Sequence, residues 1–344
     1  MVGSTDRDAV RLRIIPIAWP MAPAPAIPRP GAPRLLAPLL ALLLAGCASP
    51  QSPGPGAATG GLRVVTTVLP VGLFTRAVAG ECARVEALLP AGADLHDLPI
   101  SPQLVVRLRD ADVLVGNGLG LEDPLERLVV AAANPRLRQV EAAQGIPALT
   151  SRGHHQHGDH HHSGEPHQAG EAANPHVWLD PRLAARQVRT IRNALVAADP
   201  TRADCFRRNA GRYLAELERL DRDLARQLAP HAGRPMVSFH DLAPYFAQRY
   251  RLRAESVVAL PGDNPSVADL QRLAAQLRQQ RVRALLVDPQ LEASSFRALA
   301  ADLDLRVIGF DPIERASEAD ARRPAHYLEA MRRNGAAVLE SLRG

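Results

Sequence analysis

The sequence predicts an α/β protein of two lobes, each a parallel sheet flanked by helices, joined by one long helix. Apolar segments of strand length alternate with amphipathic segments of helical length, first from residue 62 and again after residue 231. Such alternation favours parallel sheets that are covered on both faces. Between the two series, one helical pattern extends over residues 200–230. The chain has 344 residues, 46% of them apolar, which is enough to form two hydrophobic cores.

The first lobe is expected over residues 62–199. Short apolar runs predict three strands, over residues 62–69, 84–90 and 112–118. Amphipathic runs predict three helices, over residues 71–80, 102–111 and 121–133. A further helix is expected to begin at Asp180 and Pro181, because a carboxylate caps the first turn and proline fits the first helical position.

The linking helix is expected over residues 200–230, and the second lobe over residues 231–344. Asp199 and Pro200 repeat the Asp–Pro start, and apolar residues then keep helical spacing at Tyr213, Leu217, Leu220, Leu224 and Leu228. At about 1.5 Å per residue, such a helix would be about 45 Å long. In the second lobe the patterns predict strands over 235–239, 254–260, 282–288 and 305–310, and helices over 243–250, 266–280, 291–303 and 325–342.

The N-terminus predicts a secretory signal of the lipoprotein type over residues 1–46. Arg34 precedes a short apolar run that is too short to span a membrane, and the run ends at Leu44-Ala45-Gly46-Cys47. This ending resembles a bacterial lipobox, in which Cys47 becomes the lipidated first residue; an ordinary signal peptide that contains a Cys is the alternative. Either Met1 or Met21 fits as the start of the chain. Residues 47–61, rich in Pro, Gly and Ser, predict a flexible tether.

The charge gives no support to nucleic-acid binding. The formal net charge is +5, and it falls to +2 without residues 1–46, which hold five Arg and two Asp. Aromatic residues, which would stack on bases, make up 3% of the chain. The remaining cysteines, Cys82 and Cys205, lie in separate predicted elements, and we expect no disulfide between them, although two cysteines alone leave the question open.

A histidine-rich segment over residues 153–169 interrupts the first lobe. It contains the run "HHQHGDHHHSGEPH", and its seven histidines are His154, His155, His157, His160, His161, His162 and His167. Such a composition indicates auxiliary metal binding with modest affinity, near a tighter site elsewhere. A tolerated insertion with no role is the alternative.

Four other residues occupy matched positions. His96, His176, His240 and Asp311 each lie at a connection between a strand and a helix. Ligands of open α/β sheets bind beyond the carboxyl ends of the strands, so two facing lobes would bring these residues to one cleft. Three imidazoles and one carboxylate form a tetrahedral set that suits Zn²⁺. The sequence therefore predicts a metal cleft between the lobes.

From about Leu62 onward the chain resembles the metal-binding solute-receptor family of ABC importers, the zinc and manganese group. The segments that carry this resemblance are "NGLGLED", "NPHVWLDP", "FHDLAPYFAQRYRL", "PSVADL" and "FDPI". The resemblance implies the metal ligands His96, His176, His240 and Asp311. It also implies an extracytoplasmic lipoprotein, on the periplasmic side in a Gram-negative cell, which acts as a monomer and delivers its ion to an importer permease with its ATPase. Histidine at the third ligand favours zinc over manganese, because carboxylates suit manganese.

The first ligand segment departs from the family pattern. The family has Pro-His-x-aromatic-Glu-Pro there, whereas this chain has Leu95-His96-Asp97-Leu98-Pro99. Asp97 could orient an imidazole by accepting a hydrogen bond. Asp288, in "VDPQ", is expected to line the cleft.

Three other functions remain open. A manganese or iron receptor of the same family differs only in its ion. A zinc hydrolase would need an open coordination position and a general base, and the chain has no HExxH segment. An adhesin would need a partner surface that does not depend on metal. We expect a receptor and not an enzyme.

Overall fold

The computed structural model describes residues 61–90, 101–150, 173–258, 282–289 and 304–343, as well as 271, 274, 275, 277–280 and 300–302. These residues belong to one compact unit that begins at Ala57. The predicted signal peptide with Cys47, the segment around His96 and the histidine-rich segment lie outside the described residues.

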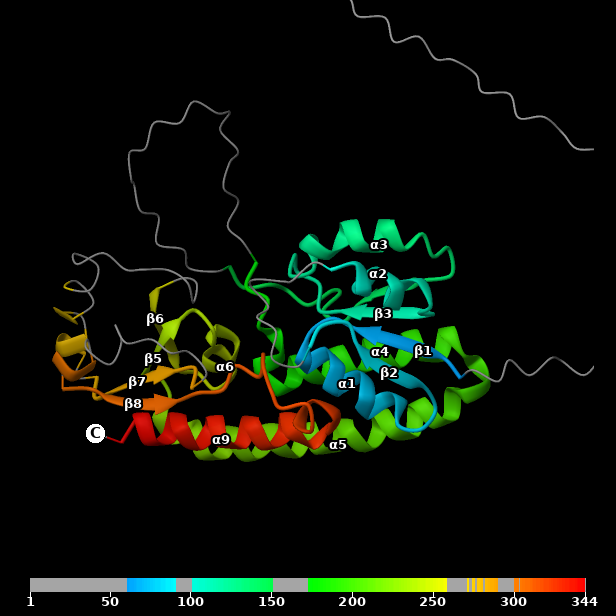
Figure 1. Ribbon diagram of the computed structural model, residues 1–344. Helices are drawn as coiled ribbons and strands as arrows, with labels where there is room; N and C mark the ends of the chain where they lie inside the picture. Colours follow the sequence, from blue (N-terminus) through cyan, green and yellow to red (C-terminus); the bar gives the residue numbers. More distant parts are fainter. Residues whose placement is uncertain are drawn as a thin grey trace, which may run out of the picture. The chain divides into compact units, whose positions relative to one another are not determined.

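The first lobe contains a parallel sheet, as predicted, and this sheet has four strands where three were expected. Its strands are β1 (Arg63–Thr66), β2 (Arg84–Ala87), β3 (Val113–Gly116) and β4 (Arg138–Glu141), in the order β2-β1-β3-β4. Figure 1 shows helices on both sides of this sheet. They are α1 (Leu69–Ala79), α2 (Pro102–Arg109), α3 (Glu126–Ala132) and α4 (Pro181–Ala198).

Neighbouring residues of a strand explain why both faces are covered. On β1, Val64 packs in the cluster that contains α1 and α4, and Val65 packs in the cluster of α2 and α3. On β3, Val113 packs in the first of these clusters and Leu114 packs in the second. A strand with apolar side chains on both faces has to be buried on both, which is the arrangement of parallel sheets.

The second lobe repeats this topology. Its strands are β5 (Pro235–His240), β6 (Arg253–Val258), β7 (Ala284–Val287) and β8 (Arg306–Gly309), all parallel, in the order β6-β5-β7-β8. Helix α6 (Pro244–Arg249) connects β5 to β6. The helices expected over 266–280 and 291–303 lie largely outside the described residues.

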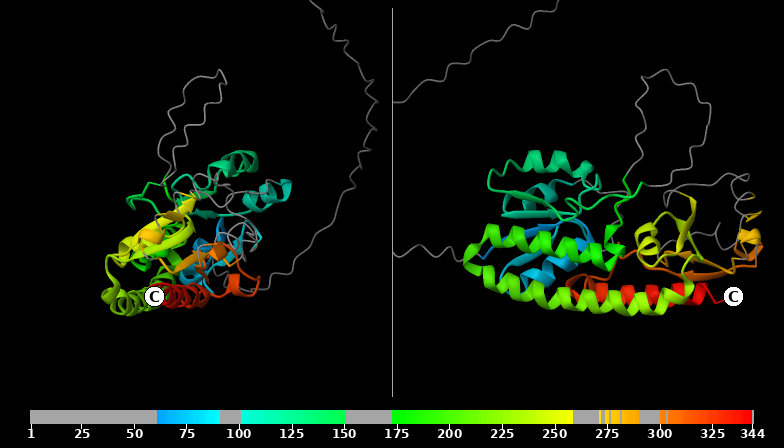
Figure 2. Two further views of the ribbon diagram at one scale, coloured as in Figure 1. Left: turned by 90° about the vertical axis from the view of Figure 1, so that its left-hand side faces the viewer. Right: turned by 180° about the vertical axis from the view of Figure 1, so that it is seen from behind.

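Two long helices link the lobes. Figures 1 and 2 show α5 (Ala203–Leu228) and α9 (Ala325–Ser341) side by side beneath the second sheet, and α5 continues beneath the first lobe. All five residues of the predicted apolar stripe on α5 are buried. With 26 residues, α5 is about 39 Å long. Short 3₁₀ turns complete the described chain: η1 (Asp123–Leu125), η2 (Val177–Leu179), η3 (Pro200–Arg202), η4 (Ala229–His231) and η5 (Asp320–Arg322).

Two features differ from the sequence-based expectations. Strand β4 was not expected, because its residues Arg-Gln-Val-Glu are mostly polar and exposed, which an edge strand permits. The expectation of no disulfide is wrong: Cys82 is bonded to Cys205, and their Cα atoms are 6.5 Å apart. Within the described residues, we find no helix with the length and apolar character needed to cross a membrane.

Candidate metal centre

Both lobes present a switch point at the carboxyl ends of their strands. In each sheet the first and third strands are neighbours, and the chain leaves the first strand towards one edge of the sheet and the third strand towards the other edge. Ligands of doubly wound sheets bind in the crevice at that point. His240 is the last residue of β5, the central strand of the second sheet. His176 lies in the turn just before η2 and α4.

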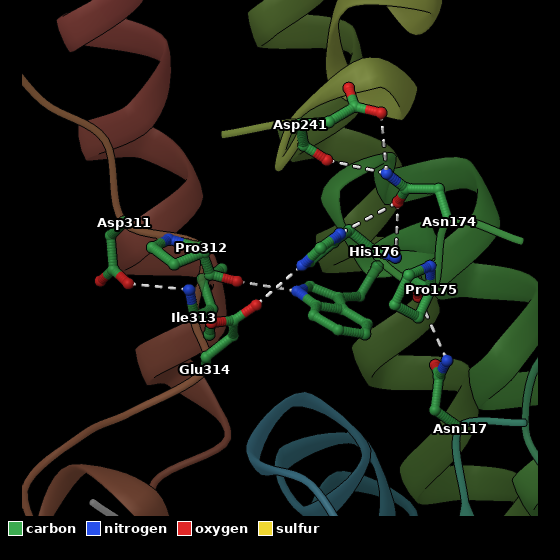
Figure 3. Close-up of polar contacts among 10 residues, drawn as sticks. Asn117, Asn174, Pro175, His176, Asp241, Asp311, Pro312, Ile313 and Glu314 are labelled. Carbon is green, nitrogen blue, oxygen red and sulfur yellow. Dashed lines mark hydrogen bonds and ion pairs between the residues drawn. The ribbon is translucent and has the colours of Figure 1, made fainter. Parts of the chain in front are cut away.

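The turn Asn174-Pro175-His176 holds its imidazole through the side chain of Asn174. Residues before proline adopt extended conformations, and asparagine caps turns two residues on. The Asn174 Oδ1 accepts hydrogen bonds from the backbone N–H of His176 and from its Nδ1, both at 3.0 Å (Figure 3). The Asn174 Nδ2 donates to the carbonyl oxygen of Asp241 at 2.7 Å. All of these groups are buried.

These contacts determine which nitrogen of His176 carries a proton. Because Asn174 Oδ1 can only accept, the Nδ1 of His176 must donate. The other nitrogen, Nε2, lies 2.8 Å from Oε1 of Glu314, and both side chains are 4% exposed. Nε2 of His176 and an oxygen of Glu314 therefore face each other in a buried site, as two ligands of one ion do.

Glu314 was not predicted, and a strained turn after β8 positions it. Asp311 Oδ1 accepts the N–H of Ile313 at 2.8 Å, and Ile313 has a φ of 62°, which is rare for a β-branched residue. Trp178 Nε1 donates to the carbonyl oxygen of Pro312 at 2.8 Å. Asn334 of α9 accepts the backbone N–H of Asp311 at 2.8 Å and donates to its carbonyl oxygen at 2.7 Å. Strain of this kind costs about 1–3 kcal/mol and is concentrated at functional sites.

His240 lies beside His176 in the same buried region. It is 1% exposed, and the two ring centroids are 6.3 Å apart. Asp288 is also buried; the register that pairs Ser238 with Leu286 places it level with His240, at the carboxyl edge of the sheet.

The described residues bring some of the predicted ligands together. His176 and His240 lie close to each other, and Glu314 contacts His176. The Asp311 carboxylate accepts a hydrogen bond from Ile313 N and lies 3.7 Å from Arg333. Among the described residues, no three His, Cys, Asp or Glu side chains are grouped as an ion would need. His96 falls outside the described residues, so the predicted ligand set stays untested.

The segment "NGLGLED" supports the His176 turn from the first lobe. Asn117 Nδ2 donates to the carbonyl oxygen of Pro175 at 3.1 Å, and Gln187 Nε2 donates to Asn117 Oδ1 at 2.8 Å. Glu122 accepts the backbone N–H groups of Asn117 and Gly118, at 2.7 and 2.9 Å. Burial raises the pKa of the Glu122 carboxyl, and these donors oppose the rise. The loop after β3 is therefore held in place by hydrogen bonds between its own residues.

Together, the fold and this site define a class of protein. Two lobes of the same topology, joined by a long helix, place buried imidazoles and a carboxylate at their facing switch points. This is the arrangement of a two-lobed solute-binding receptor for a cation.

Comparison with known proteins identifies the family. Residues 64–341 match the profile of ZnuA, described as zinc-uptake complex component A, periplasmic. The chain belongs to this family of substrate-binding proteins of the zinc-uptake type. The resemblance inferred from the sequence is thus confirmed, as is the two-lobed α/β fold.

Similar proteins include two curated relatives and a solved structure. The chain is 29% identical over 305 residues to the zinc-binding lipoprotein AdcA of Streptococcus pneumoniae serotype 4 (strain ATCC BAA-334 / TIGR4), covering 87% of this chain and 58% of AdcA. It is also 29% identical to the high-affinity zinc uptake system protein ZnuA of Bacillus subtilis (strain 168), covering 88% and 94%. The Zn(II)-bound ZnuA-like domain of S. pneumoniae AdcA superimposes with a TM-score of 0.69 at 26% identity, covering 83% and 100%. The chain therefore spans little more than half the length of AdcA.

Proposed function

We propose that this protein is a high-affinity zinc receptor, which captures Zn²⁺ outside the cytoplasm and delivers it to an ABC importer. The observation that carries the proposal is the buried contact between His176 and Glu314, with His240 buried beside His176, at the carboxyl ends of the strands. Imidazole nitrogens with one carboxylate suit Zn²⁺. The relatives named as zinc-binding lipoprotein and zinc uptake protein support the same ion.

The proposed ligands are His96, His176, His240 and one carboxylate. The sequence favoured Asp311 for that carboxylate. The geometry favours Glu314, because its Oε1 faces Nε2 of His176, while Asp311 holds the backbone of the turn that carries Glu314. Three neutral imidazoles and one carboxylate leave a net charge of +1 on the bound ion, which keeps release to a permease possible. Binding requires deprotonated ligands, so affinity should fall at acidic pH.

The partners and location follow from the same proposal. The receptor would be a monomer anchored to the membrane by a lipid on Cys47 and would dock on an importer permease with its ATPase. The histidines of residues 153–169 would bind zinc weakly and raise its concentration near the cleft. In a Gram-negative cell the protein would lie on the periplasmic side.

Competitive metal titration of the chain from residue 48 tests the proposal. We expect one tight zinc equivalent, which survives deletion of residues 153–169. It should weaken by more than about 100-fold in His176→Ala, His240→Ala and Glu314→Ala, since even a residue that only supports a ligand contributes 10–100-fold. His231→Ala, at the last residue of η4, is the matched control and should bind as the parent does.

Other outcomes of the titration would change the assignment. Loss of tight binding with the deletion would make the protein a histidine-rich metal sink. Manganese binding at least as tight as zinc would replace the proposed ion. A larger loss in Asp311→Asn than in Glu314→Gln would restore Asp311 as the ligand. Metal-dependent turnover of an ester or peptide would indicate a hydrolase.

A further inference from the structure

One buried amide joins the metal centre to the base of the histidine-rich segment. Residues 149, 150, 173 and 174, here called the stem, bracket that segment on both sides. Thr150 and Ala173 form an antiparallel bridge, and the N–H of Asn174 donates to the carbonyl oxygen of Leu149 at 2.7 Å. The stem therefore ends at the residue whose side chain holds His176.

The hydroxyl of Tyr245 closes the stem from the second lobe. It accepts the N–H of Leu149 at 2.9 Å and donates to the carbonyl oxygen of Asn174 at 2.7 Å. Tyr245 belongs to α6, which follows His240 and Asp241, and it is 1% exposed. One hydroxyl thus ties both strands of the stem to the helix that begins just after His240.

The side chain of Asn174 continues this connection to both imidazoles. Its Oδ1 accepts two hydrogen bonds from His176, and its Nδ2 donates to the carbonyl oxygen of Asp241, the neighbour of His240. The second Nδ2 proton points to Asp241 Oδ2 at 3.5 Å. An amide has two acceptor sites and two donor protons, and each of them has a partner. The amide can therefore neither flip nor turn without breaking a buried contact.

We propose that Asn174 is a positioning residue, which, with Tyr245, couples the stem of the histidine-rich segment to the metal centre. Asn174 keeps the proton of His176 on Nδ1, so that Nε2 is the nitrogen that faces the ion. Through Asp241 it also fixes the end of β5, and so the place of His240. The Tyr245 hydroxyl holds Asn174 in register with the stem. This inference rests on the proposed function, because it concerns how that zinc site is held.

Zinc titrations of three variants test the coupling. Asn174→Ala should weaken zinc binding by about 10–100-fold, the usual effect of removing a partner that orients a metal-binding histidine. Tyr245→Phe removes only the hydroxyl and should weaken binding by about 3–10-fold, since it acts through Asn174. In the double variant the two effects should fall short of additivity, as expected of residues in one network. Tyr250→Phe, which removes the hydroxyl of a buried tyrosine that contacts Asp221, is the matched control and should leave affinity unchanged.

A second measurement separates positioning from general destabilisation. In ¹⁵N NMR of the metal-free chain, the Nδ1–H signal of His176 should be protected from exchange in the parent and in Tyr250→Phe. It should lose this protection in Asn174→Ala and weaken in Tyr245→Phe. Asn174→Asp keeps both acceptors for His176, and its signal should persist.

The outcomes show separately whether the proposed coupling and the proposed zinc-receptor function are correct. Tight zinc binding that stays within twofold of the parent in Asn174→Ala would overturn the inference and leave the function intact. Equal losses in Tyr250→Phe and Tyr245→Phe, or strict additivity in the double variant, would overturn the coupling. If the parent bound no zinc tightly, the proposed function would be wrong, and the Nδ1–H signal would still decide whether Asn174 orients His176.

Discussion

At the scale of single residues, Asp180 caps a helix, but burial destabilises the charged form of its carboxyl. Its Oδ1 accepts the N–H of Arg182 at 2.7 Å and so caps α4, as its Asp–Pro sequence predicts. Burial raises the pKa of the Asp180 carboxyl to about 6, and the hydrogen bond from Arg182 opposes this rise. The folded chain therefore holds a proton on Asp180 at pH values where the unfolded chain has lost it.

We predict that Asp180→Asn stabilises the protein at neutral pH. From pH 3.8 to about 6 the folded state binds the extra proton, so the contribution of Asp180 to stability falls as pH rises and stays low above pH 6. Asparagine caps as well as aspartate but carries no charge. The variant should gain about 1–2 kcal/mol at pH 7, because loss of the favourable charge–dipole interaction offsets part of the gain.

Urea denaturation at pH 4 and pH 7 checks this prediction. The gain should shrink towards zero at pH 4, where Asp180 is protonated in the folded state. Asp199→Asn, at the other Asp–Pro start, is the control for the loss of a capping charge. An equal gain at both pH values would contradict the pKa shift as its cause.

Some residues of the candidate site could be predicted from the sequence, and others could not. His176 and His240 could be proposed because each follows or precedes an element at the carboxyl side of a predicted sheet. Glu314 could not, because its place depends on the positive φ of Ile313, which no pattern of residue types predicts for a β-branched side chain. The Asp–Pro pair before it was a usable signal. Aspartate before proline tends to bond its own backbone two residues on, as Asp311 does.

At the scale of elements, the disulfide joins the turn after α1 to the first turn of α5. The sequence could not show this, because the pairing depends on α5 packing back on α1. Helix α1 runs from the carboxyl end of β1 back towards the other edge of the sheet, so Cys82 lies at the edge opposite the metal centre. A disulfide is compatible with an oxidising compartment outside the cytoplasm.

We predict that the double variant Cys82→Ser, Cys205→Ser loses about 2–5 kcal/mol of unfolding free energy, since the bond closes a loop over a sequence separation of 123 residues. Zinc affinity should stay within about twofold, because the ligands lie at the opposite edge of the sheet. Chemical denaturation and zinc titration measure the two effects. Reducing the parent should lower its stability to that of the variant, and a reductant should leave the variant unchanged. Two titratable thiols in the unreduced parent would refute the bond.

Element prediction succeeded where burial dominates and missed one edge strand, β4. The apolar runs of β1, β3 and β7 are buried, so their residue types alone identify them. Helix α5 was predicted because its buried stripe keeps one period over 26 residues. Strand β4 has a single apolar residue and pairs only with β3, so its existence depends on its neighbour and not on its own sequence.

At the scale of the whole molecule, the two lobes share one hydrophobic core. A single cluster of buried residues includes Val64 of the first sheet and Leu286 of the second. The ring of Phe74 on α1 packs edge-on against Tyr327 on α9, with centroids 4.8 Å apart. The hydroxyl of Tyr327 in turn bonds the carbonyl oxygen of Trp178. The lobes are thus tied through α9 as well as through α5.

We therefore predict that the protein unfolds in one cooperative transition, and that zinc shifts this transition as a whole. A ligand at 100 times its Kd adds about 2.7 kcal/mol to the unfolding free energy, which corresponds to about 5 °C in Tm for a unit of this size. Differential scanning calorimetry with and without zinc measures both effects. His176→Ala should keep the single transition and lose the shift. Two separate transitions, with only one of them moved by zinc, would show that the shared core does not couple the lobes and that the ion is held by one lobe alone.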